Sequence, residues 1–245
     1  MISNFLFIGH RGTRRDFDEN TILAFKMAKE YGANYIEFDI RKTKDRKLVV
    51  LHDSNLNRTT EGSGLLKDFT YKEIKAFKTV IHKNTIPLLI EVLDEFNGMI
   101  NFMIELKEED LVDDVAEVIK ANNLIGNIVI SGKRLHDLLR IKNKVPHIRI
   151  CFNITNGLGL SLLEFLKMEE EIKKKIKIDM ISLKSNLISQ KFIEKCHVNE
   201  IMALSWDFLG YENPITKINS LITKGIDGIL FDDFNNIKKI RMGLV

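Results

Sequence analysis

Residues 35–53 read YIEFDIRKTKDRKLVVLHD, and this stretch decides which fold the chain can adopt. Two short β-rich runs, residues 35–39 and 47–51, are separated only by the polar, turn-like segment 41–46. A crossover between parallel strands needs about a dozen residues or more, so this segment is too short to hold one. We therefore expect the two runs to form an antiparallel β-hairpin.

Similar β-rich runs recur along the whole chain, and most are followed by an amphipathic helical pattern, which is typical of βα units in a parallel sheet. Besides the two runs of the hairpin, they cover residues 5–9, 101–106, 127–131, 147–152, 180–183, 201–205 and 228–231. If run 47–51 belongs to the hairpin alone, eight strands remain to alternate with helices. An α/β fold of this kind, a (β/α)8 TIM barrel, typically takes ~250 residues. The chain has 245 residues.

The sequence predicts one domain, residues 1–245, with a small insertion after the second strand at about 40–98. Besides the hairpin, this insertion contains the glycine-rich loop 62–64 and a short helix near 71–77. Helix signals support the pattern elsewhere. Asn20 or Thr21 can cap a helix that ends at Gly32, and Asn213-Pro214 begins another that ends at Gly225.

The composition excludes several classes of protein. With 37 Lys and Arg against 34 Asp and Glu, the net charge is +3, which gives no broad electrostatic surface for nucleic acid. Cys151 and Cys196 stand far apart in no metal-ligand spacing. We find no signal-peptide pattern and no run of the ~18 apolar residues that a membrane-spanning helix needs. We therefore expect a cytoplasmic protein without stable membrane insertion.

Acidic side chains gather where the barrel strands end, which is where a TIM barrel carries its active site. Glu37 and Asp39 are two apart on one strand and so face the same side, and Glu105 ends the next barrel strand. Three carboxylates around one point suit a hard cation, Mg²⁺ or Ca²⁺. The simpler alternative is structural ion pairing, for example between Glu105 and Lys107.

Two histidines lie in the same region. His10 follows the first strand directly, and the expected hairpin brings His52 roughly opposite residues 35–37. A histidine pair beside a metal is suited to general acid and general base work near neutral pH. The sequence leaves open which histidine plays which part, and for His10 alone a structural role is the simpler alternative.

Two cationic side chains near the same strand ends are candidates for binding an anion. Arg11 and Lys107, beside a metal, are suited to holding the oxygens of a phosphate. Trp206 ends a later strand, where it can pack in the core or form an apolar wall for a substrate.

Several of these residues belong to an ordered set of short motifs, which resembles the glycerophosphodiester phosphodiesterases of the phospholipase-C-like barrel superfamily. The set comprises His10-Arg11-Gly12, Glu19-Asn20-Thr21, Ile36-Glu37-Phe38-Asp39, Thr43-Lys44-Asp45, Val49-Val50-Leu51-His52-Asp53, Leu56-Asn57-Arg58-Thr59-Thr60, Ile86-Pro87, Ile104-Glu105-Leu106-Lys107, Ser205-Trp206 and Gly225-Ile226-Asp227-Gly228-Ile229. The resemblance implies Glu37, Asp39 and Glu105 as metal ligands, His10 and His52 as the acid–base pair, and Arg11 and Lys107 as phosphate contacts. It also implies an insertion after the second strand.

The chain departs from the family pattern at four places. Asp18 stands where proline is usual, Arg46 replaces a common turn glycine, and Gly132 stands where an aromatic residue is frequent. Residues 207–209, Asp-Phe-Leu, replace the usual Thr-x-Asn after the tryptophan. This last change affects the expected contacts to the leaving group or to glycerol.

The resemblance implies metal-dependent hydrolysis of a small-molecule glycerophosphodiester to sn-glycerol 3-phosphate and an alcohol. Three alternatives remain: a lysophospholipase D, a non-catalytic phosphodiester-binding protein, and a barrel isomerase or aldolase acting on a sugar phosphate. An acid–base pair argues against binding alone. The sequence does not define the preferred alcohol, the physiological cation or the oligomeric state.

Overall fold

The computed structural model describes residues 5–122, 124–168 and 177–243. Its centre is a closed barrel of eight parallel strands, β1 and β2 followed by β4 to β9, in which β1 pairs with both β9 and β2. This is the expected TIM barrel. The strands are β1 Leu6–Gly9, β2 Tyr35–Lys42, β4 Asn101–Leu106, β5 Ile128–Gly132, β6 Arg149–Asn153, β7 Met180–Lys184, β8 Met202–Trp206 and β9 Gly228–Phe231.

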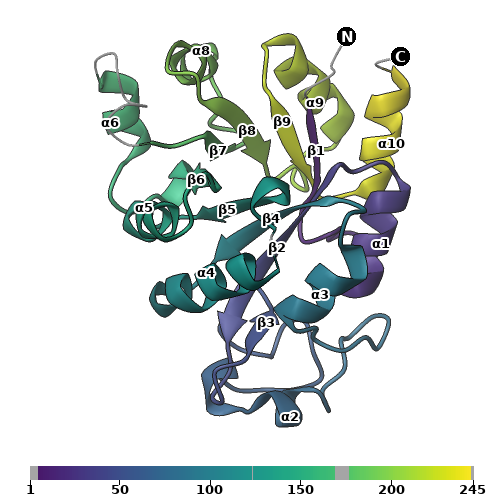
Figure 1. The fold of residues 1–245 in the computed structure, drawn as a ribbon. Coiled ribbons are helices and arrows are strands. Elements are labelled where there is room, and N and C mark those ends of the chain that lie inside the picture. Colours follow the sequence, from purple (N-terminus) through teal and green to yellow (C-terminus); the bar gives the residue numbers. More distant parts are fainter. Residues whose placement is uncertain (1–4, 123, 169–176, 244–245) are drawn as a thin grey trace.

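Helices surround the barrel in Figure 1 and follow the strands in chain order. They are α1 Ile22–Glu30, α3 Leu89–Phe96, α4 Val112–Ala121, α5 Leu135–Lys144, α6 Leu162–Lys167, α8 Gln190–Val198, α9 Pro214–Thr223 and α10 Phe234–Gly243, with short 3-10 turns η2 Glu109–Leu111, η3 Ile125–Asn127 and η4 Ile154–Asn156. The predicted caps of α1 and α9 are confirmed, since Thr21 and Asn213 accept hydrogen bonds from the first turns of these helices. No helix in the described ranges is long and apolar enough to cross a bilayer.

The barrel has two packed layers. Inside it lies a cluster of buried side chains from the strands, among them Leu6, Ile8, Met103, Met180 and Leu204. A larger apolar layer fills the space between the outer face of the strands and the helices. Successive side chains of a strand point alternately to the inner and the outer layer, and both layers are buried. These strands therefore consist of apolar residues almost throughout.

The surplus strand β3 Leu48–Val50 pairs antiparallel with β2, so the expected hairpin is confirmed. Its turn is shorter than we expected from the sequence, because Arg41 and Lys42 continue β2 and Lys42 lies opposite Leu48. Lys42 is able to remain in a buried strand because its ammonium pairs with Asp114 at 2.6 Å. Thr43 closes the turn by accepting a hydrogen bond from the Lys47 amide. Continued to position 52, this register places His52 opposite Phe38 rather than opposite residues 35–37.

The insertion follows β2, lies at the bottom of Figure 1 and contains β3, η1 Leu66–Asp68 and α2 Tyr71–Ile74, whereas α3, which precedes β4, packs against the barrel. The insertion has a small apolar core of its own, formed by Val49, Leu51, Leu56, Leu66, Ile74 and Ile86.

Asp18 fastens the insertion to the loop after β1. Its buried carboxylate accepts hydrogen bonds from the Thr79 hydroxyl at 2.8 Å and from the amides of Ile81 and His82 at 2.9 and 2.7 Å. Although burial opposes the charge, these donors hold the pKa of Asp18 below its ordinary value. A proline at this position would lack the carboxylate, so the departure from the family pattern has a structural reason.

Candidate active site

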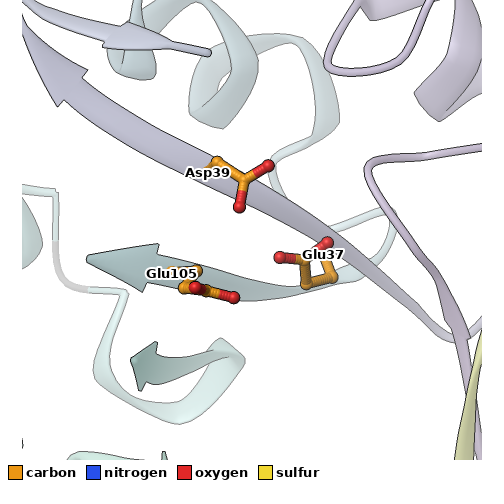
Figure 2. Close-up of side chains that lie close together, drawn as sticks. All are labelled: Glu37, Asp39 and Glu105. Atoms are coloured by element: carbon orange, nitrogen blue, oxygen red, sulfur yellow. The ribbon is translucent and has the colours of Figure 1, made fainter. Parts of the chain in front are cut away.

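The three predicted carboxylates meet at the C-terminal ends of two neighbouring strands. Glu37 and Asp39 lie on β2 and Glu105 lies on β4, with Asp39 directly opposite Glu105 in the register. One oxygen of each carboxylate lies within 4.8 Å of one oxygen of the others. Figure 2 shows the three side chains gathered between the two strands. We call these residues the acidic cluster.

The surroundings shift the pKa values of Glu37 and Asp39 in opposite directions. Burial, and after it the negative charges of Asp39 and Glu105, raises the pKa of Glu37 well above its ordinary value. Asp39 is equally buried, but the cations of Lys107 and Arg11 outweigh burial and lower its pKa. The Glu37 Oε1 atom is buried and finds no hydrogen-bond partner among the described residues. An all-oxygen donor set with one unsatisfied oxygen fits a hard divalent cation.

His10 follows β1, and the barrel closure brings it to the cluster. Its Nδ1 lies 2.7 Å from Oδ1 of Asp232, which follows β9, and its Nε2 lies 4.0 Å from Oε2 of Glu37. Asp232 also accepts hydrogen bonds from Arg14 Nε at 2.7 Å and from the Phe208 amide at 2.8 Å. Burial, and after it the charge of Arg14, lowers the pKa of His10 although Asp232 opposes this shift. Asp232 thus orients the ring and leaves Nε2 facing the cluster.

His52 reaches the same place from the insertion and is held by a chain of ion pairs. Its Nδ1 lies 2.6 Å from Asp53 Oδ1, and Arg41 Nε donates to its backbone oxygen at 2.8 Å. Arg58 donates to Asp53 at 2.7 Å and to Glu19 at 2.6 Å, and its hydrogen bond lowers the pKa of Asp53 to about 2. Burial, together with the charges of nearby cations, lowers the pKa of His52 despite the attraction of Asp39.

Arg11 and Lys107 border the cluster as predicted. The Arg11 amide donates to Glu37 at 2.8 Å, and its guanidinium pairs with Glu19 at 2.8 Å and with Asp39 at 3.2 Å. Lys107 Nζ lies 2.9 Å from Asp39 and 2.5 Å from Glu105. Gly12 permits this arrangement, because its φ is +79° and a Cβ there would come 2.7 Å from the backbone of α1.

One open cavity of about 260 Å³ is lined by His10, Arg11, Glu37, His52, Glu105 and Lys107, whereas Asp39 does not line it. Trp206 lines it as well, with its ring edge-on to His10 at 6.2 Å between centroids. Its indole Nε1 is buried and has no hydrogen-bond partner in the part of the chain that the structure describes. All eight residues singled out in the sequence therefore come together at one end of the barrel.

Sequence reasoning did not assign Asn20, Asp53, Arg58 or Asp232 to the site. Asn20 proves to be a support for Asp39, because its amide donates to the Asp39 carboxylate at 2.8 Å. Asn20 and Arg58 stand in the quoted motifs, and Asp53 adjoins His52, so their proximity to candidate residues was the available signal. For Asp232, the signal was a polar residue directly after the last barrel strand.

The barrel and the groups at its mouth are those of a phosphodiesterase. The chain matches the glycerophosphoryl diester phosphodiesterase family over residues 10–236. It is 32% identical to a glycerophosphodiester phosphodiesterase of Caldanaerobacter subterraneus subsp. tengcongensis over 241 residues, covering 93% of this chain and 94% of the relative. The chain belongs to this family.

Two further similarities extend the comparison. A human lysophospholipase D is 35% identical over 129 residues, which cover 47% of this chain and 41% of that protein. An Oleispira antarctica phosphodiesterase, solved in complex with the product sn-glycerol-3-phosphate, superposes with a TM-score of 0.80 at 21% identity and covers 98% of this chain and 96% of its own. At that identity the superposition shows the common fold.

Proposed function

We propose that this protein is a metal-dependent hydrolase that cleaves glycerophosphodiesters to sn-glycerol 3-phosphate and an alcohol. The observation that carries the proposal is the pair His10 and His52, each held through Nδ1 by a carboxylate at the edge of one acidic cluster. Binding alone needs no such pair, whereas hydrolysis of a diester needs a base and an acid. The relative from Caldanaerobacter and the glycerol phosphate complex of the Oleispira enzyme support the same substrate class.

Each group of the site has a defined task in this reaction. Glu37, Asp39 and Glu105 would hold the cation, which when bound supplies positive charge at the phosphoryl oxygens. Arg11 and Lys107 bind the same oxygens and stabilise the charge that develops in the transition state. One histidine accepts the proton of the nucleophile at Nε2, and the other donates a proton to the leaving oxygen.

For the nucleophile we favour the neighbouring glycerol hydroxyl. An oriented hydroxyl within the substrate has a large effective molarity and needs only one histidine as base. Its attack on phosphorus releases the alcohol and leaves a cyclic glycerol phosphate, which water then opens to sn-glycerol 3-phosphate. Arg11 and Lys107 serve both steps, because both develop charge on the same phosphoryl oxygens.

The proposal is tested by incubating the purified protein with glycerophosphoserine, glycerophosphoethanolamine and glycerophosphocholine, with and without Mg²⁺ or Ca²⁺. We expect release of sn-glycerol 3-phosphate that depends on the cation. An absence of turnover with every diester and cation would refute the proposed activity.

A second candidate is a lysophospholipase D, because the insertion exposes the apolar side chains Leu65, Val80 and Ile81 by 43, 45 and 56%. A kcat/KM for lysophosphatidylcholine above that for glycerophosphocholine would favour this candidate.

Cys151 and Cys196 are free and buried, and on this ground we place the reaction in the reducing cytoplasm.

A further inference from the structure

Lys133 is an unusual member of the cavity wall. It follows β5 directly, at the end of the barrel that carries the site, and its side chain is exposed and lines the cavity. Within the described ranges, no carboxylate lies at ion-pair distance from its ammonium. The ammonium is therefore available to a ligand in the cavity.

The other cations of the cavity are already paired with carboxylates. Arg41 lies 2.9 Å from Glu108, and Arg11 and Lys107 contact the acidic cluster, as described above. Their charges are balanced by the protein and serve the phosphate and the cluster. The charge of Lys133 has no such counterpart among the described residues, so it adds a positive potential to its side of the cavity.

On the side of Lys133 away from β4, the lining residues that β6 and β7 contribute to the cavity are neutral. Asn153 and Ser182, on β6 and β7, and Asn156, in η4, line this side of the cavity. The carboxylates among the described lining residues, Glu37 and Glu105, belong to the acidic cluster on β2 and β4. A quaternary ammonium is bound best by aromatic faces or carboxylates. On this side it would meet an ammonium instead.

The two halves of the substrate differ in whether they can carry a charge that interacts with Lys133. The glycerol half is neutral and is the same in every glycerophosphodiester, whereas the alcohol half varies and can carry a charge. An uncompensated cation next to the phosphate site therefore discriminates between alcohols. We propose that Lys133 is a specificity-determining residue that favours diesters whose alcohol carries a negatively charged group, a carboxylate or a second phosphate. This inference rests on the proposed function.

Glycerophosphoserine and glycerophosphoethanolamine test it directly, because they differ by a single carboxylate on the alcohol. We expect the wild-type protein to show the higher kcat/KM for glycerophosphoserine. The ratio of the two kcat/KM values should fall about 3–5-fold in Lys133→Gln, as for one exposed ion pair, and about tenfold or more in Lys133→Glu. The preference should also weaken as salt is added.

Lys191→Gln is the matched control. Lys191 is an exposed lysine in the first turn of α8 that does not line the cavity, and its replacement changes the net charge equally. We expect the wild-type ratio in this variant. Since Lys133 is exposed, its variants should fold, which circular dichroism and thermal unfolding check.

Three results would overturn the inference. If the ratio of the two kcat/KM values is unchanged in both Lys133 variants, with both diesters still hydrolysed, the residue does not discriminate between the alcohols. An equal loss with both diesters shows that it contacts the shared phosphate. If the wild-type protein hydrolyses none of glycerophosphoserine, glycerophosphoethanolamine and glycerophosphocholine, the proposed function fails and the inference fails with it.

Discussion

Replacement of Asp232 by asparagine tests the role of the buried contact behind His10. Asp232 is 3% exposed, and its two oxygens accept from His10 Nδ1, Arg14 Nε and the Phe208 amide. Asparagine keeps the shape, but its NH2 group must replace one of the two oxygens. It takes the place either of the oxygen that accepts from the Phe208 amide or of the oxygen that contacts both His10 and Arg14. In the second orientation it also favours the wrong tautomer of His10, with the proton on Nε2.

The expected magnitude follows from the lost interaction. A hydrogen bond to a charged group contributes about 1.5–3 kcal/mol, and 1.4 kcal/mol corresponds to a factor of ten. We therefore expect Asp232→Asn to lower kcat by about 10- to 100-fold, with KM changed much less because Asp232 does not touch the phosphate site. The assay couples release of sn-glycerol 3-phosphate to its dehydrogenase under saturating cation.

Asp233→Asn is the control for this variant. Asp233 is the next residue, pairs with Arg15 at 3.2 Å and accepts from the Asn235 amide at 2.8 Å, and neither contact involves His10. We expect its kcat to stay within about twofold of wild type. If Asp232→Asn is folded and also retains kcat within twofold, His10 does not depend on Asp232 and the positioning argument is refuted.

Three further predictions concern the cluster, the histidines and the nucleophile. Chelation should abolish turnover, and Glu37→Gln should act mainly through weaker cation binding, so excess Mg²⁺ or Ca²⁺ should restore part of its activity; full activity after exhaustive chelation would exclude the cation. His10→Ala and His52→Ala should each lower kcat ~10²–10⁴-fold, and the double variant should lose far less than the product of the two, measured on an unactivated diester. A diester whose glycerol 2-hydroxyl is replaced by hydrogen should keep its KM and turn over far more slowly; an equal kcat would favour attack by water.

The fold was predictable because its deciding signals are local. The alternation of short apolar runs with capped helices indicates βα units, and the short polar segment before Leu48 separates the hairpin from the barrel strands. The register that we predicted for that hairpin was wrong for a physical reason. Arg41 and Lys42 have the composition of a turn, yet Glu108 and Asp114, far along the chain, pair with them and keep them in the strand.

The candidate site was predictable to the extent that strand ends define it. Glu37, Asp39 and Glu105 follow from the period of two along a strand and from the pairing of neighbouring strands. Asp232 also follows a strand directly, but its contact with His10 could not be found in this way, since it joins residues 222 positions apart and exists only because the barrel closes. Likewise, the sequence gives no indication that Lys133 has no carboxylate partner among the described residues.

The division of the two histidines between separately packed parts of the molecule has a consequence for heat inactivation. His10 is anchored in the barrel, whereas His52 depends on the insertion, whose own core consists of a few side chains such as Leu56 and Ile74. A unit with so little buried apolar surface opens at a lower free energy than the barrel it is attached to. Activity should therefore disappear on heating while the barrel keeps its helical circular dichroism, and return on cooling as the insertion closes again.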